Sequence, residues 1–317
     1  MRASTLACTL LACLLPSLAS ATEGLAWQWN EGQERRFLLQ GNIRFAEFFF
    51  VQSKDNRDLR VVELYVAAFT TCKAVATARK FTSLACSIDD VELRGAPPAQ
   101  DANRGLVDTL NEWDALYRKA VVQLDLGNDG RIRTLDLEGI DGRIDRYRAI
   151  QEQMRLVMVR LFSGLELQLP KKGNDKEESW TQRESTTLQL PSPVGSFGGV
   201  RIEHEVTGVQ ESVVTVTRIG KGSIVSGETI GAPGSGERPR NQFAAQLQGT
   251  ARFDVASGTL VEQNLLASAE PTASSALATG VAGTLYVQAL HSEVIPAGAK
   301  VEPLEANAET VPGKNGI

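Results

Sequence analysis

The sequence predicts a β-dominated α+β protein in which a long curved antiparallel sheet or half-barrel packs around one long central helix and one short helix. The central helix is predicted from residues 141–162, the longest stretch whose apolar residues have helical spacing. On both sides of it, apolar and polar residues alternate as they do in half-buried strands. The longest alternation, Gln242–Val255, has the length of strands in strongly curved sheets, half-barrels or barrels.

The predicted helix at 141–162 has one apolar face and one charged face. Asp141 is placed to cap its N-terminus, and Gly164 stands where the chain leaves the helix. Such a helix either fills an ordinary core or forms one wall of a pocket for a lipid. In the second case, the candidate pocket residues are Tyr147, Met154, Val157, Met158, Leu161 and Phe162.

The first 21 residues have the composition of a secretory signal peptide. Arg2 supplies a positive charge, an apolar run follows, and Ala19-Ser20-Ala21 forms a cleavage site. We therefore expect cleavage after Ala21 and export to the periplasm or the medium. The alternative is a lipoprotein signal in which Cys13 becomes the lipidated N-terminus. No later run reaches the roughly 20 apolar residues of a transmembrane helix, so no transmembrane segment is expected after signal cleavage.

Three strands are predicted in the first third of the chain, at residues 36–45, 59–72 and 81–93. Once the signal peptide is removed, Cys72 and Cys86 are the remaining cysteines, and each lies on the apolar side of its predicted strand. An even pair of cysteines in an exported protein predicts one disulfide. We therefore expect a Cys72–Cys86 bridge between two neighbouring antiparallel strands.

A hairpin is predicted at residues 122–137, with Gly and Asn in its turn. The same stretch partly resembles a calcium-binding loop, because Asp125, Asp129 and Asp136 fall at its first, fifth and twelfth positions. Gly127 stands at the third position, where such a loop needs an oxygen ligand, and the flanking residues alternate as in strands. A plain hairpin is the favoured interpretation, and a calcium site is the alternative.

The remaining elements are a short amphipathic helix around 106–117, before the hairpin, and a series of strands after the central helix. A short alternation at 165–169 comes first. An antiparallel meander is then predicted from strands at 200–207, 213–219, 242–255, 260–267 and 281–291.

We expect residues 22–295 to form a single β-rich domain. It would have two parts, at about 27–140 and 163–295, joined by the central helix. Residues 296–317 have little apolar surface to bury and are expected to form a disordered tail.

The titratable residues form no recognisable catalytic constellation. His204 and His291 are expected to be core or rim residues with one hydrogen bond each. Asp89 and Asp90 are expected at a β-bulge or sheet edge, and a hydrolase using these four residues is only an alternative. No motif for phosphate, dinucleotide or zinc binding is present, so we expect no enzyme activity, cofactor or metal site. The formal net charge of −5, without a basic block, argues against a nucleic-acid partner.

The order of these elements resembles that of bacterial envelope proteins of the lipoprotein-carrier half-barrel type. It is also similar to exported β-rich proteins in which an early Trp-x-x-Gly turn, here Trp29 to Gly32, opens the first strand. The resemblance implies a non-catalytic periplasmic module that encloses a lipid or acyl chain. The alternative is an envelope or surface scaffold with a solid core, whose loop at 231–240 and polar tail contact a protein partner.

Overall fold

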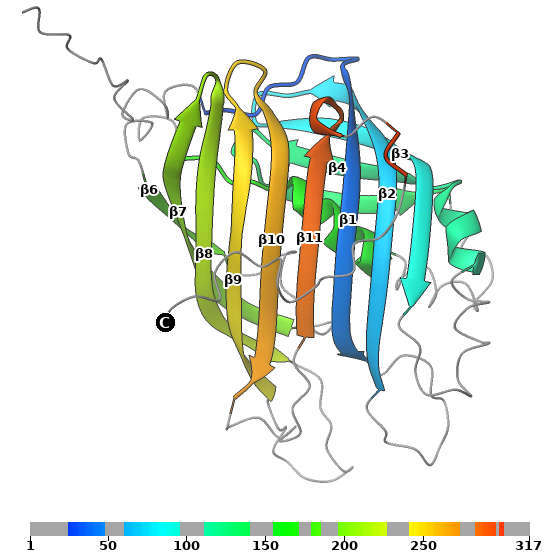
Figure 1. Ribbon diagram of the computed structural model, residues 1–317, viewed down its shortest axis with the longest axis vertical. Coiled ribbons are helices and arrows are strands. Elements are labelled where there is room, and N and C mark those ends of the chain that lie inside the picture. Colours follow the sequence, from blue (N-terminus) through cyan, green and yellow to red (C-terminus); the bar gives the residue numbers. More distant parts are fainter. Residues whose placement is uncertain are drawn as a thin grey trace, which may run out of the picture.

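The computed structural model describes residues 25–47, 60–95, 111–139, 155–170, 179–184, 196–226, 241–272, 283–295 and 298–300. Its strands form one eleven-stranded antiparallel sheet in the order β5-β4-β3-β2-β1-β11-β10-β9-β8-β7-β6 (Figure 1). The strands are β1 (Glu34–Glu47), β2 (Arg60–Thr77), β3 (Phe81–Gly95), β4 (Val121–Gly127), β5 (Ile132–Glu138), β6 (Ser179–Glu184), β7 (Ser196–Gln210), β8 (Val213–Ser226), β9 (Asn241–Asp254), β10 (Thr259–Pro271) and β11 (Gly283–His291). Helical residues are 111–117, 155–162 and the 3-10 turns η2 (Ser163–Leu165) and η3 (Ser292–Val294).

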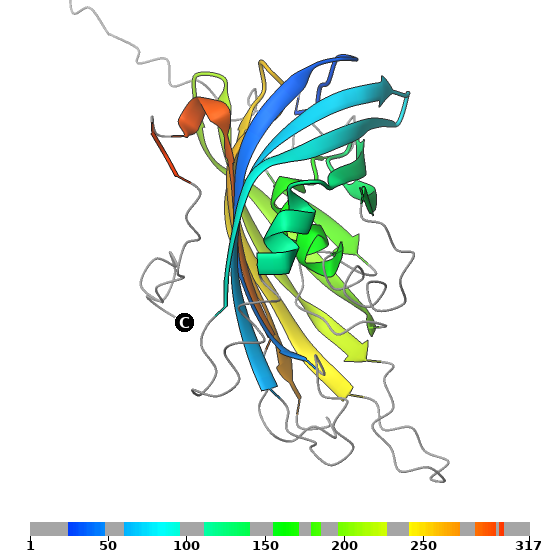
Figure 2. The ribbon, with the colours of Figure 1, turned by 90° about the vertical axis from the view of Figure 1, so that its right-hand side faces the viewer.

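The sheet is bent into an open trough, and the helices at 111–117 and 155–162 lie on its concave side (Figure 2). The β-dominated prediction and the curved antiparallel sheet are therefore confirmed. The sheet is not closed into a barrel, because β5 and β6 stand at opposite ends of the strand order. Among the described residues, no helix combines the length and the apolar character needed to cross a membrane.

One pairing joins the two ends of the chain. All neighbouring strands are consecutive in sequence except β1 and β11, whose register runs from Phe37 opposite His291 to Arg44 opposite Thr284. The edge strands β5 and β6 are in turn connected by the stretch that contains the helix at 155–162. The described part of this connection, residues 155–170, lies on the concave side of the sheet.

The predicted disulfide is present. Cys72 of β2 and Cys86 of β3 are directly opposite each other, with 3.9 Å between their Cα atoms, and both are fully buried. A disulfide is typical of proteins outside the reducing cytosol. The bulge at the acid pair is also confirmed. Asp90 lies opposite Phe69 and Ile88 lies opposite Thr70, so Asp89 has no partner in the register.

Several predicted boundaries need correction. The helix is described only from residue 155 to 162, and the earlier part of the predicted 141–162 helix lies outside the described residues. Residues 165–169 are not a strand, because the chain runs through η2 and then extended without pairing in the sheet. Strand β6 was missed, since its short polar sequence lacks a clear apolar alternation. Of the predicted tail, only 298–300 are described.

Candidate functional site

The concave face of the sheet divides into two levels. The strand registers place Gly41, Val287, Leu265, Gly249 and Arg218 in one row across the sheet. The side of this row toward Glu47, the last residue of β1, carries no polar side chain among the described concave residues of β1, β2 and β7 to β11. These residues are all apolar or glycine. We call this lower level the apolar floor; it includes Ile43, Leu64, Val200, Ile202, Gly220, Gly222, Ile224, Phe243, Ala245, Leu247, Ala267, Ala269 and Leu285.

The helix at 155–162 and the segment that follows it occupy the upper level. Glycines allow this close approach: Leu161 Cδ1 lies 3.5 Å from the position of a Cβ on Gly41, and a Cβ on Gly164 would lie 2.6 Å from Val287 Cγ1. The helical residues 155–162 span about 12 Å, whereas the 14 residues of β9 span about 46 Å. The described part of the helix therefore spans only a fraction of the length of the trough, although floor residues such as Ile43, Leu247 and Leu285 are also buried.

Residues 163–169 stay on the concave side because their backbone groups find partners outside the sheet ladder. The carbonyl of Leu167 accepts a hydrogen bond from Trp27 Nε1 at 3.1 Å, and that of Gln168 accepts one from Trp180 Nε1 at 3.2 Å. The backbone N–H of Leu169 donates to the carbonyl of Asp129 at 2.9 Å. A buried segment must satisfy its polar groups, and here side chains and a turn do so in place of a neighbouring strand.

A buried polar group fastens the same segment to the sheet. Gln263 of β10 donates to the carbonyls of Gly164 and Glu166, at 2.9 and 3.3 Å. Arg218 of β8 donates to Gln263 Oε1 at 3.1 Å and to the Glu166 carbonyl at 3.2 Å. Arg218 is only 1% exposed. Buried charges are stable only when they are paired or hydrogen-bonded, so these contacts determine the position of the segment.

His204 of β7 lies beside this group, opposite Arg218 in the register and stacked on Trp180 with 5.0 Å between ring centroids. It is a core residue, as predicted, but neither ring nitrogen has a well-aligned hydrogen-bond partner among the described residues. Burial lowers the pKa of His204 to about 3, and the charge of Arg218 acts in the same direction. The ring is therefore neutral at ordinary pH.

This neutral histidine should make the protein sensitive to acid. In the unfolded chain the pKa of His204 returns to about 6.5, so below that pH the unfolded state binds a proton that the folded state does not. Between pH 6 and 4 this linkage removes about 1.4 kcal/mol of stability per pH unit. We expect His204→Leu to reduce the loss of stability on acidification, measured by urea unfolding at pH 7, 5 and 4. Parallel pH profiles for the two proteins would contradict the assignment.

Of the six residues predicted to line a pocket, the structure describes four. Val157, Met158, Leu161 and Phe162 are buried in the main core against the sheet. Tyr147 and Met154 lie outside the described residues.

The calcium candidates take part in a plain hairpin. Asp125 accepts hydrogen bonds from the hydroxyls of Ser83 and Thr134, at 2.6 and 2.8 Å. Asp129 lies in the turn, and Asp136 accepts a hydrogen bond from the N–H of Leu137. Within the described residues, no group of three or more His, Cys, Asp or Glu side chains is arranged to hold a metal.

The acid pair Asp89 and Asp90 is engaged in surface contacts at the bulge of β3. Asp89 accepts hydrogen bonds from Thr71 and Ser87, and Asp90 pairs with Arg118 at 2.5 Å. The two carboxylates therefore have different partners and do not face a common pocket.

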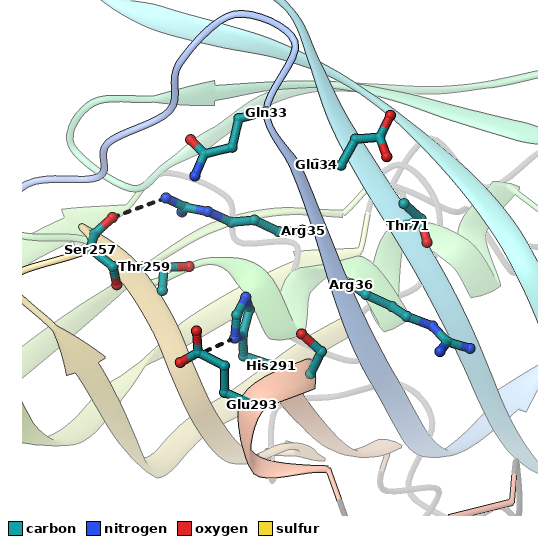
Figure 3. Close-up of a pocket in the computed structure, with 10 residues that line it drawn as sticks. Gln33, Glu34, Arg35, Arg36, Thr71, Ser257, Thr259, His291 and Glu293 are labelled. Carbon is teal, nitrogen blue, oxygen red and sulfur yellow. Dashed lines mark hydrogen bonds and ion pairs between the residues drawn. The ribbon is translucent and has the colours of Figure 1, made fainter.

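A second, polar feature lies where β11 ends, between β1 and the turn that joins β9 to β10 (Figure 3). It is a cavity of about 510 Å³, which we call the β11-end pocket. In Figure 3, Arg35 points from β1 toward Ser257, Arg36 points away from it, and Glu293 lies beside His291. The lining residues are Gln33, Glu34, Arg35, Arg36, Thr71, Ser257, Thr259, His291, Ser292 and Glu293.

Sequence reasoning missed Arg218, Gln263 and Arg35. Arg218 and Gln263 each stand at a position that the alternation of their strand assigns to the buried face. A polar residue at such a position could have indicated a buried polar contact. Arg35 precedes a clean alternation and carries no comparable signal.

The fold and these contacts define an open antiparallel half-barrel whose concave face holds a segment of its own chain. No protein-family model matches the sequence, and no curated protein matches it. Among solved structures, a chain described as "lipid-protein interactions in lipovitellin" is similar at a TM-score of 0.48 and 9% identity. The match covers 88% of this chain and 27% of that chain. This similarity is too low to assign a family or a function.

Proposed function

We propose that this protein is a non-catalytic binding module that holds an apolar ligand, a lipid or acyl chain, against the apolar floor of its trough. The observation that carries the proposal is the separation of polar and apolar residues on the concave face. Arg218, Gln263 and His204 lie at the level of the internal segment, and below them every concave residue of β1, β2 and β7 to β11 whose side chain the structure describes is apolar or glycine.

The size of the floor residues supports the same function. Several floor residues are small and leave space above the sheet between their larger neighbours. They are Ala245, Ala267, Ala269, Gly220 and Gly222. A flexible alkyl chain gains about 0.8 kcal/mol for each CH₂ group that it removes from water. An acyl chain lying along the trough would gain this contact without the need for a polar partner.

The disulfide supports placement of this module outside the cytosol, and so do the signal-peptide features of the first 21 residues. In that compartment a lipid-binding trough would carry its ligand through an aqueous space. We therefore include export to the periplasm or the medium in the proposal.

The test compares two substitutions of adjacent residues on β9. Ala245 is buried on the concave face, and Ala244 is exposed on the convex face. We expect the unmodified protein to bind the fluorescent fatty acid cis-parinaric acid. Ala245→Phe should weaken this binding about tenfold or more because its ring fills the floor, whereas Ala244→Phe should leave it unchanged.

Circular dichroism and urea unfolding would show that both variants fold, and the milder Ala245→Leu provides a second test if Ala245→Phe does not. Mass spectrometry of organic extracts of the purified protein would identify any lipid that co-purifies. Absence of both uptake and co-purified lipid would overturn the proposal. The scaffold alternative would then be favoured.

A further inference from the structure

The β11-end pocket exists because one strand is shorter than its neighbours. The pairing of β1 with β11 begins at Phe37 and His291, so Arg35 and Arg36 extend beyond the last residue of β11. On the other side, β10 begins at Thr259. The chain leaves the sheet at this point through η3, and a gap opens between β1 and β10.

Two deeply buried polar side chains line this gap, and each has an atom without a hydrogen-bond partner among the described residues. Thr259 is 2% exposed, and the side chain of His291 is 9% exposed. Thr259 Oγ1 and His291 Nδ1 have no hydrogen-bond partner among the described residues, and Glu293 Oε2 is 3.9 Å from the histidine nitrogen. Buried polar atoms are satisfied in the great majority of proteins, so two unsatisfied atoms in one cavity point to a ligand.

The charged side chains around the gap have partners in the protein. Arg36 pairs with Asp89 at 3.7 Å and Glu34 pairs with Lys73 at 3.0 Å, while the charge of Glu293 acts on Arg35. Burial lowers the pKa of His291, so its ring adds no charge near neutral pH.

The guanidinium of Arg35, moreover, is occupied by the protein itself. It donates to the carbonyls of Gln28 and Ser257 at 2.6 and 3.0 Å, and to that of Gly258 at 3.4 Å. It also lies over the ring of Trp29. The cavity therefore offers neither a free cation for an anionic ligand nor a cluster of acids for a cation.

We propose that the β11-end pocket binds a neutral, hydroxyl-rich ligand of the saccharide class. A hydroxyl group both donates and accepts hydrogen bonds. It can therefore pair with the Thr259 hydroxyl, and with His291 Nδ1 whether that nitrogen carries the proton of the neutral ring or not. The carboxylate of Glu293, which lies beside His291, accepts further hydroxyl hydrogen bonds. The cavity volume of about 510 Å³ lies within the range of small-molecule sites. This site is separate from the apolar floor and does not depend on lipid binding.

The two histidines of the chain provide a direct readout. Protein labelled with ¹⁵N and ¹³C at histidine gives side-chain NMR signals from His291, in the pocket, and from His204, in the core. We expect titration with glucose or maltose to shift the His291 signals in a saturable manner and to leave those of His204 in place. Substitution of each histidine by Gln assigns the signals.

Thr259→Val retains the shape of the side chain and removes its hydroxyl, so it should weaken sugar binding about tenfold. Thr215→Val, on the convex face of β8, is the matched control and should bind as the unmodified protein does. The proposal is overturned if neither sugar shifts His291 up to about 50 mM. It is also overturned if only glucuronate or only glucosamine does so, or if Thr259→Val binds normally.

Discussion

Arg218→Met is expected to lower the free energy of unfolding by about 3–5 kcal/mol, because it leaves two buried acceptors without the charged donor that satisfies them. Methionine retains an apolar chain in place of the aliphatic part of Arg218 but cannot donate to Gln263 Oε1 or to the Glu166 carbonyl. Those acceptors would remain buried, and the buried residue Glu166 would lose the adjacent positive charge. Urea unfolding at pH 7 measures the difference.

The matched control is Arg201→Met on β7. The Arg201 side chain is 57% exposed and its contact with Glu203 is a surface ion pair, so the change should stay within about 0.5 kcal/mol. A second readout comes from His204, whose pKa the charge of Arg218 lowers. NMR titration of Arg218→Met should show this pKa raised. A loss of stability below about 1 kcal/mol would show that the buried polar group does not hold the internal segment.

Gly130→Ala should destabilise the protein by a comparable amount, about 3–5 kcal/mol, because two costs add. Gly130 has a φ of +77°, a conformation that disfavours a side chain by about 1–2 kcal/mol. In addition, a Cβ at this position would overlap the carbonyl oxygen of Leu167 and lie against Trp27 Nε1. The β4–β5 turn would then have to separate from the internal segment.

Gly32→Ala isolates the first of these costs. Gly32 has nearly the same φ, +78°, but a Cβ there would meet no atom within 4 Å. We expect a loss of about 1–2 kcal/mol for Gly32→Ala, from the backbone conformation alone. The difference between the two variants, obtained by thermal or urea unfolding, measures the contact between the turn and the segment. Equal effects would mean that this contact contributes nothing.

The long alternating strands could be predicted because each one carries its own signal. In β9, Phe243, Ala245 and Leu247 alternate with polar residues, and this pattern requires no knowledge of the neighbouring strands. The pairing of Cys72 with Cys86 was predictable for a similar reason, since the two strands are adjacent in sequence and both thiols lie on the apolar side.

The contacts that build the two candidate sites could not be predicted in this way. Arg218 and Gln263 meet Glu166 across sequence separations of 52 and 97 residues. The alternation at 165–169 predicted a strand, but the available hydrogen-bond partners were the side chains of Trp27, Trp180 and Gln263. A local pattern cannot show which distant groups will compete for a backbone carbonyl.

The sequence by itself therefore determined the β-dominated class, most of the strands, the turn at Gly130 and the disulfide, because these depend on local periodicity and neighbouring strands. Only the tertiary structure decided that β1 pairs with β11, and this pairing depends on residues about 250 positions apart, as for Phe37 and His291. That pairing joins the N-terminal and C-terminal strands into one trough and leaves the gap at the end of β11. Both candidate sites follow from it.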